Sequence, residues 1–257
     1  GSIRWSYSTG SRAEHDALVE SFYAEANEFL GGAATGIGEK ELALRQEICE
    51  VAHRMYEAGF SPANSGNISG RLGEGQYLIT PSGVCKKDLT PDMLVKIDDG
   101  CNPIDGGKAS SEARVHVYCY QHRPDVMGVC HSHAPFATAF ACMDRKLDRY
   151  ILPDQVVYLG AVPRCEYQMY GTQGVAESMA PYIERHSALL LGNHGTVTMG
   201  DSVLDSYYRL EALEQYAKIL FITTLMGGAR AFTQEEAQAI FDDIRQSGMI
   251  HPGNIRL

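Results

Sequence analysis

The chain has 257 residues, long enough for one large α/β domain that buries roughly three quarters of its unfolded surface. Its hydrophobic content of 44% and charged content of 21% exclude a disordered or fibrous protein. The formal net charge of −10 has the wrong sign for neutralising nucleic-acid phosphates. The apolar run at residues 219–226 is too short to cross a bilayer, which takes about 20 residues. We therefore expect neither a nucleic-acid partner nor a membrane span.

The seven cysteines are scattered along the chain without a C-x-x-C pair. An odd and unclustered set argues against a disulfide framework and favours a reducing compartment. The N-terminal residues contain no apolar segment typical of a secretion signal. We expect a cytoplasmic protein.

Hydrophobic periodicity predicts an N-terminal extension, residues 1–38, and a single domain, residues 39–257. In the extension, apolar residues recur at helical spacing between positions 19 and 30, which predicts one helix there. In the domain, helices are predicted at residues 39–58, 111–121, 135–143, 172–185, 203–225 and 233–246. Strands are predicted at residues 67–72, 76–80, 94–97, 126–131, 156–159, 187–191 and 196–199. The alternation of helices with short strands indicates an α/β fold.

Two histidines lie at the end of a predicted strand, in the sequence H-S-H at residues 131–133. In a continued strand, His131 and His133 project from the same face, as two ligands of one metal ion would. The glycines of G-N-H-G, residues 192–195, allow a tight turn that would place His194 at the end of another strand. Each motif alone also fits an ordinary surface histidine.

A carboxylate next to a predicted helix start offers a fourth ligand. Ser111 can cap this helix, and Glu112 then lies in its first turn, where a negative charge is favoured. A purely structural role for Glu112 is equally open. His116 lies four residues further on the same helical face, and a hydrogen-bonding role inside the protein is preferred over metal binding.

Two short loops have the composition of anion-binding sites. Residues 64–69 and 80–83 combine glycine with small hydroxyl and amide side chains, which lets backbone N–H groups converge on a phosphate. Ser110 and Ser111 add a helix N-terminus. As isolated strings these loops are also ordinary turns.

Taken in order, five motifs resemble the class II aldolase/adducin family: S-G-N-I-S (65–69), I-T-P-S-G (79–83), S-S-E-A-R-V-H (110–116), H-S-H-A (131–134) and G-N-H-G (192–195). The resemblance extends over roughly residues 40–247, with the nearest likeness to members that cleave L-fuculose 1-phosphate. It implies a three-layer α/β/α domain with a mostly antiparallel central sheet. It also implies a homotetramer with active sites at subunit interfaces.

The resemblance implies a role for each matched residue. The expected metal ligands are His131, His133, His194 and Glu112, and Glu112 is also the expected acid/base. The metal would be Zn²⁺, with Mn²⁺, Fe²⁺ and Co²⁺ as alternatives. The expected contacts to the substrate phosphate are Gly66, Asn67, Ser82, Gly83, Ser110 and Ser111.

The implied reaction is the cleavage of a ketose 1-phosphate to dihydroxyacetone phosphate and an aldehyde, through an enediolate whose charge the metal stabilises. In family members a tyrosine protonates the aldehyde oxygen, and Tyr150 and Tyr158 are the candidates here. Neither aligns cleanly. An epimerase, a decarboxylase or a dehydratase that forms a similar enolate is therefore the second hypothesis. A non-catalytic scaffold like the adducin head is the third.

Overall fold

The computed structural model describes residues 38–143 and 147–247. It divides the chain into two units, residues 1–43 and residues 44–257. The described part of the first unit is the start of helix α2 (Glu39–Glu57), which continues into the second unit. The helix predicted between residues 19 and 30 lies outside the described residues.

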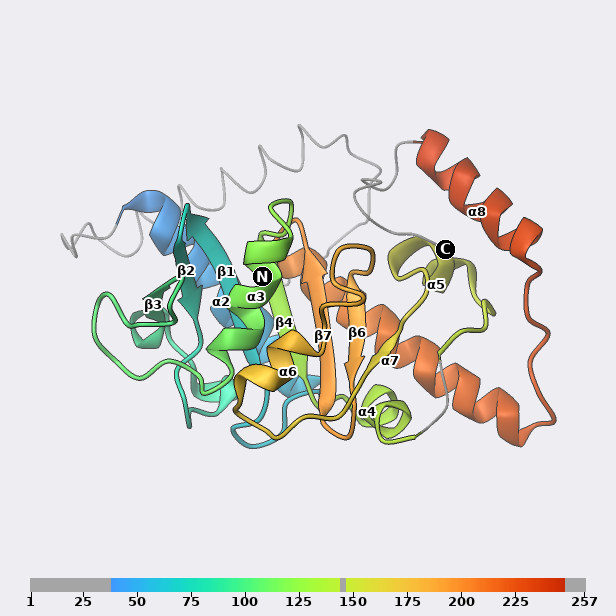
Figure 1. Ribbon diagram of the computed structural model, residues 1–257, viewed down its shortest axis with the longest axis horizontal. Helices are drawn as coiled ribbons and strands as arrows, with labels where there is room; N and C mark the ends of the chain where they lie inside the picture. Colours follow the sequence, from blue (N-terminus) through green and yellow to red (C-terminus); the bar gives the residue numbers. More distant parts are fainter. Residues whose placement is uncertain (1–37, 144–146, 248–257) are drawn as a thin grey trace, which may run out of the picture. The chain divides into compact units, whose positions relative to one another are not determined.

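The described residues of the second unit form one seven-stranded sheet in the order β3-β2-β1-β4-β7-β6-β5 (Figure 1). Neighbouring strands are antiparallel except β5 and β6, which are parallel. The strands are β1 (Asn67–Gly73), β2 (Gln76–Ile79), β3 (Val95–Asp98), β4 (Gly128–Ser132), β5 (Arg164–Cys165), β6 (Ala188–Leu191) and β7 (Gly195–Gly200). The sheet is therefore mostly antiparallel, as predicted.

Helices cover both faces of this sheet (Figure 1). Helices α3 (Ala113–His122) and α6 (Gln173–Glu177) pack on one face, where Val129 of β4 joins their core. The next residue, Cys130, points to the opposite face and packs with α2 and α7 (Val203–Leu225). The remaining helices are α4 (Pro135–Ala141), α5 (Pro153–Tyr158) and α8 (Gln234–Ser247), with 3-10 turns at Lys86–Asp88 and Pro91–Met93. This arrangement confirms the predicted three-layer α/β/α fold.

Strand register brings the predicted functional motifs to one edge of the sheet. Asn67, the first residue of β1, pairs with His131 near the end of β4, and Ser132 pairs with Thr196 at the start of β7. In antiparallel neighbours the start of one strand lies beside the end of the next. His133 and His194, which flank β4 and β7, are therefore close together although they are 61 positions apart in the sequence.

Two predicted elements differ from the structure. Residues 156–159, predicted as a strand, lie largely in helix α5, which begins with Pro153 at a position that proline favours. A short run of apolar residues cannot by itself distinguish a strand from one buried helical turn. The helix predicted at residues 172–185 is regular only in α6 and continues as turns.

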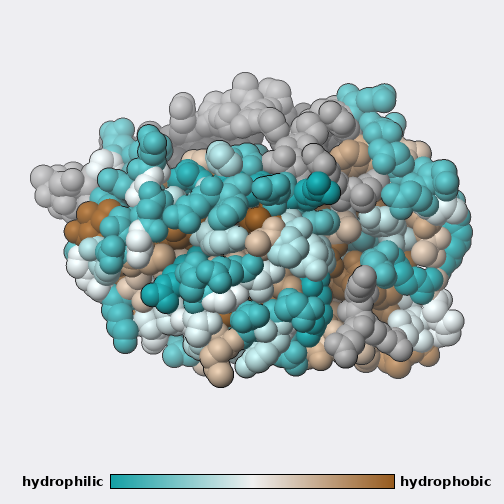
Figure 2. Space-filling model, in the orientation of Figure 1, coloured by the Kyte–Doolittle hydropathy of each residue, from teal (hydrophilic) through white to brown (hydrophobic). Residues whose placement is uncertain are grey.

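The face of the molecule over α3 and α6 is largely hydrophilic (Figure 2). Within the described residues, no helix combines the length and the apolar character that a bilayer crossing requires.

Candidate metal centre and active site

Three imidazoles converge at the sheet edge. Each of His131, His133 and His194 offers one ring nitrogen, and these atoms lie within 4.8 Å of one another. The approach of the strands requires glycine at position 195, because a Cβ there would lie 2.4 Å from the Ser132 carbonyl oxygen. Asn193, with φ of 51°, makes the preceding turn. The structure thus brings the two predicted histidine motifs together.

The hydrogen bonding of His131 directs a lone pair at this cluster. Its Nδ1 lies 2.8 Å from the backbone oxygen of Thr196, which can only accept, so Nδ1 carries the proton. In the neutral ring, Nε2 is then an unprotonated ligand atom. It faces His133 Nε2 and Glu112 Oε2, each at 3.2 Å. A backbone carbonyl that fixes the tautomer in this way is typical of metal-binding histidines.

Glu112 faces the imidazoles from the other side of the site. Its side chain is 5% exposed, and its Oε1 lies 3.0 Å from His194 Nε2. Neither of these two buried atoms has a hydrogen-bond partner of good geometry among the described residues. Buried ligand atoms that face one another without shared protons are the arrangement that a cation stabilises. The three histidines therefore fit a divalent metal ion, and Glu112 lies beside two of them.

The local position of Glu112 differs from the expected one. It is the N-cap residue of α3 and not a first-turn residue, and Ser111 does not cap the helix. The Oγ of Ser110 accepts a hydrogen bond from the Glu112 N–H at 3.3 Å. The carboxylate consequently projects from the helix start toward the imidazoles.

Charge and burial set the protonation of the site. Burial acts to raise the pKa of Glu112, but the adjacent His131 and His194 outweigh it, so the pKa lies below its ordinary value. Burial, together with the neighbouring imidazoles, lowers the pKa of His133 to about 4. Near neutral pH these effects leave a carboxylate and a neutral His133, the protonation states that bind metal ions.

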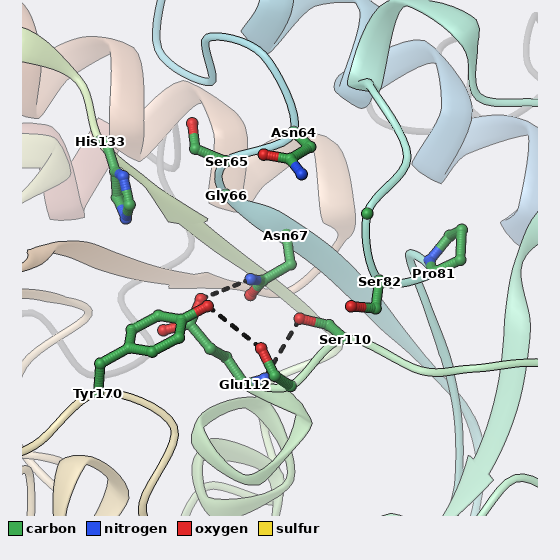
Figure 3. Close-up of a pocket in the computed structure, with 12 residues that line it drawn as sticks. Asn64, Ser65, Gly66, Asn67, Pro81, Ser82, Ser110, Glu112, His133 and Tyr170 are labelled. Carbon is green, nitrogen blue, oxygen red and sulfur yellow. Dashed lines mark hydrogen bonds between the residues drawn. The ribbon is translucent and has the colours of Figure 1, made fainter.

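A pocket of about 300 Å³ opens beside the imidazole cluster (Figure 3). Glu112 and His133 line one part of it, and Tyr170 lines another. Its wall also contains all six residues predicted to contact the phosphate, namely Gly66, Asn67, Ser82, Gly83, Ser110 and Ser111. The structure thus brings the loops and the helix start predicted as anion sites next to the candidate metal centre.

The side chain of Asn67 has a more specific set of contacts than an anion site requires. Its Nδ2 donates to Glu112 Oε2 at 2.8 Å, and its Oδ1 is bound by the Nε2 of His116. His116 is completely buried and lies outside the metal-ligand cluster, in agreement with the preferred hydrogen-bonding role.

Sequence reasoning missed Tyr170, which lies in the loop between β5 and α6. Its hydroxyl lies 3.2 Å from Ser111 Oγ, and its ring approaches His194 edge-on with centroids 5.4 Å apart. The tyrosines considered from the sequence, Tyr150 and Tyr158, are not among the residues that line the pocket. No motif marks Tyr170, because only the folded loop brings it to the site.

Lys86 was also missed. Its side chain is 1% exposed, and its Nζ donates to the backbone oxygens of Asn64 at 3.3 Å and Val84 at 3.2 Å. It therefore links the two glycine-containing loops that line the pocket and brings a positive charge to them. Burial lowers the pKa of Lys86 to about 8. In the sequence, Lys86-Lys87 reads as an exposed charged pair.

We predict that Lys86→Met raises KM for a phosphorylated substrate about tenfold, equivalent to about 1.4 kcal/mol of binding free energy, with a smaller change in kcat. The reason is that one positive charge and the link between the two loops are removed together. Steady-state kinetics with the phosphorylated substrate checks this. Lys87→Met is the matched control, because Lys87 is exposed. Equal KM values for both variants would contradict the assignment.

Comparisons with known proteins agree with this geometry. The model of the class II aldolase and adducin N-terminal domain matches residues 46–221, and the chain belongs to this family. The 3-oxo-tetronate 4-phosphate decarboxylase of Escherichia coli strain K12 is 32% identical over 71% of this chain and 88% of the relative. The L-fuculose phosphate aldolase of Methanococcus maripaludis is 30% identical over 68% of this chain and 95% of the relative.

Solved structures give the same result for the fold. YgbL from Klebsiella pneumoniae superimposes with a TM-score of 0.73 and 28% identity, covering 78% of this chain and 98% of the other. The predictions of the family, the fold and an enzyme of the carbon–carbon lyase class are confirmed. Members of the family act on phosphosugars and are typically metal-dependent.

Proposed function

We propose that this enzyme is a metal-dependent lyase that decarboxylates a four-carbon 3-oxo sugar acid carrying a 4-phosphate. The observation that carries the proposal is the position of Glu112, which lines one pocket with the loops predicted to bind anions and also faces the imidazoles of His131 and His194. A substrate with its phosphate in the loops would present its carbonyl end to this carboxylate. The matched decarboxylases supply the substrate class.

The reaction needs little from the protein beyond charge stabilisation and one proton. When the C1–C2 bond breaks, CO₂ leaves and its electron pair delocalises over C2 and the C3 oxygen as an enediolate. One proton added at C2 then gives dihydroxyacetone phosphate. A divalent cation, which we propose to be Zn²⁺ with Mn²⁺, Fe²⁺ or Co²⁺ as alternatives, supplies Lewis-acid stabilisation of the developing oxyanion.

The residues of the chain have separate roles in this proposal. His131, His133 and His194 hold the metal, and Glu112 completes the ligand set at rest. Glu112 delivers the proton to C2 during turnover. The phosphate is held by the backbone and hydroxyl groups of Gly66, Asn67, Ser82, Gly83, Ser110 and Ser111.

Aldol cleavage of a ketose 1-phosphate is the second candidate, because the matched L-fuculose phosphate aldolases cover a similar share of this chain. Breaking the C3–C4 bond of such a ketose gives the same enediolate. In addition, the C4 hydroxyl must lose a proton as the aldehyde forms, so this reaction needs a second acid/base. The expected tyrosines do not line the pocket, and Tyr170 is the described tyrosine that does.

One assay follows both candidate reactions, because both release dihydroxyacetone phosphate. The second product, CO₂ or an aldehyde, separates them. The metal-loaded enzyme is given 3-oxo-tetronate 4-phosphate or L-fuculose 1-phosphate, with and without a chelator. Product is followed by NADH oxidation in a coupled assay, and CO₂ or aldehyde is measured separately. We expect chelator-sensitive release of CO₂. Aldehyde release alone would establish the second candidate, and no product from either substrate would overturn both.

We predict that Tyr170→Phe lowers kcat for decarboxylation by less than about tenfold, since only a hydrogen-bonding hydroxyl is lost. If the enzyme is an aldolase that uses this hydroxyl for proton transfer, kcat falls at least about 100-fold. Steady-state kinetics of the variant on both substrates distinguishes these results. Tyr167→Phe is the control, because Tyr167 lies in the same loop with 54% exposure and does not line the pocket.

We further propose a cytoplasmic homotetramer. All seven cysteines lie within the described residues and are free thiols, which favours a reducing compartment. At the end of α7 the apolar residues Phe221, Ile222, Leu225 and Met226 are exposed, as in surfaces that pack against another subunit.

A further inference from the structure

A line of buried hydrogen bonds leads from the core of the sheet to Glu112. Tyr120 bonds Ser69 at 2.7 Å, and Ser69 bonds His116 Nδ1 at 2.6 Å. His116 Nε2 bonds Asn67 Oδ1, and Asn67 Nδ2 bonds Glu112 Oε2 at 2.8 Å. Each of these five residues is 5% exposed or less.

The spacing of residues along β1 and α3 explains how this line of hydrogen bonds forms. Asn67 and Ser69 are two residues apart on β1 and project from the same face of the sheet. Glu112, His116 and Tyr120 are successively four residues apart along α3 and its N-cap, so they form one stripe. The stripe lies against the strand face, and the polar groups of the two elements alternate along the line.

The direction of every hydrogen bond is determined from the carboxylate. An ionised carboxylate only accepts, so Asn67 Nδ2 donates to Glu112 and Asn67 Oδ1 must accept. His116 therefore carries its proton on Nε2, and its Nδ1 accepts from the Ser69 hydroxyl. Ser69 in turn accepts from Tyr120. Burial lowers the pKa of His116 to about 3, which keeps its ring neutral with a single N–H.

We propose that His116 is a positioning residue that, through Asn67, holds the Glu112 carboxylate in the orientation in which Oε2 accepts from Asn67 Nδ2 and Oε1 faces His194 Nε2. Because Asn67 Oδ1 already accepts from His116 Nε2–H, the amide is held with its Nδ2 toward Glu112 and cannot turn around. In this orientation each carboxylate oxygen faces a candidate metal ligand, Oε2 with His131 Nε2 at 3.2 Å and Oε1 with His194 Nε2 at 3.0 Å.

The proposal rests on the proposed role of Glu112 as the acid, but its first test requires no substrate. In the metal-loaded protein, the ring nitrogens of His116 are measured by nitrogen-15 NMR. We expect a neutral ring protonated on Nε2 throughout pH 6 to 8. A ring protonated on Nδ1, or on both nitrogens, would reverse or break the line and overturn the inference, whatever reaction the enzyme catalyses.

The second test is kinetic and uses His116→Leu. We expect kcat to fall about 10- to 100-fold, the range in which the partners of metal-ligating residues act, while KM and bound metal stay near wild type. His116→Gln, which restores an N–H donor toward Asn67, is expected to recover part of kcat. Tyr216→Phe is the matched control, because it removes another buried hydrogen bond, 2.7 Å to the Arg149 carbonyl, away from the pocket.

A third readout reports orientation directly. In D₂O, wild-type enzyme is expected to place one deuteron stereospecifically on the hydroxymethyl carbon of dihydroxyacetone phosphate. His116→Leu is expected to give a mixture of the two positions, which a loss of stability alone would not cause. A stereospecific product made at the wild-type rate by His116→Leu would overturn the positioning role. Absence of product with wild-type enzyme would instead count against the proposed function.

Discussion

His133→Ala is expected to lose its bound metal and to reduce turnover by about 10³-fold or more, the scale of one preorganised electrostatic contact. His133 contributes one of the three ring nitrogens that lie within 4.8 Å of one another. His133 comes directly after the last residue of β4, so removing its imidazole leaves the pairing of the strands intact. Metal content is measured by mass spectrometry after dialysis and compared with turnover by the coupled assay.

A second readout separates loss of metal from loss of fold. A metal that binds only the native state raises its free energy of unfolding. His133→Ala should therefore melt near the temperature of chelator-treated wild type, and added metal should raise the melting temperature of wild type only. The control is His122→Ala, because His122 is exposed at the end of α3. A His133→Ala enzyme with a full metal complement would contradict the ligand assignment.

The convergence of the candidate ligands could be predicted because each of them lies in a local pattern with a physical meaning. The H-x-H spacing marks one face of a strand end, and the glycines around His194 mark a turn between buried strands. The two loops that line the pocket are predicted as anion-binding from their glycines and small polar residues. These patterns extend over only a few neighbouring residues, so the sequence shows them directly.

The residues that were missed depend on tertiary contacts alone. Lys86 is buried because two loops close over it, whereas the adjacent Lys87 is exposed. Tyr170 reaches the pocket from a loop without periodicity. The polar line through His116 could be anticipated only in part: the helical stripe is visible in the sequence, but its partners on β1 are fixed by the packing of α3 on the sheet. The same tertiary dependence explains the strand predicted where α5 lies.

Glu112→Gln is expected to retain metal and to lower kcat by about 10²- to 10⁴-fold, the usual contribution of general acid/base catalysis. Glutamine has nearly the same shape, and its carbonyl oxygen can still accept from Asn67, which bonds Oε2 of the native carboxylate at 2.8 Å. The NH₂ group then takes the place of Oε1 near His194. An amide cannot exchange a proton with carbon, so the chemical step fails although the three imidazoles remain.

The decisive measurement for Glu112 isolates proton transfer from bond cleavage. Wild-type enzyme incubated with dihydroxyacetone phosphate in D₂O should exchange one hydrogen of the hydroxymethyl carbon, since this is the protonation step run in reverse. Glu112→Gln should lose this exchange with its metal content unchanged, whereas Glu177→Gln, at an exposed position of α6, should exchange normally. Exchange at the wild-type rate in Glu112→Gln would assign the proton transfer to another group. Because decarboxylation and aldol cleavage share this enediolate, the result holds for either reaction and tests the role of Glu112 independently of the leaving group.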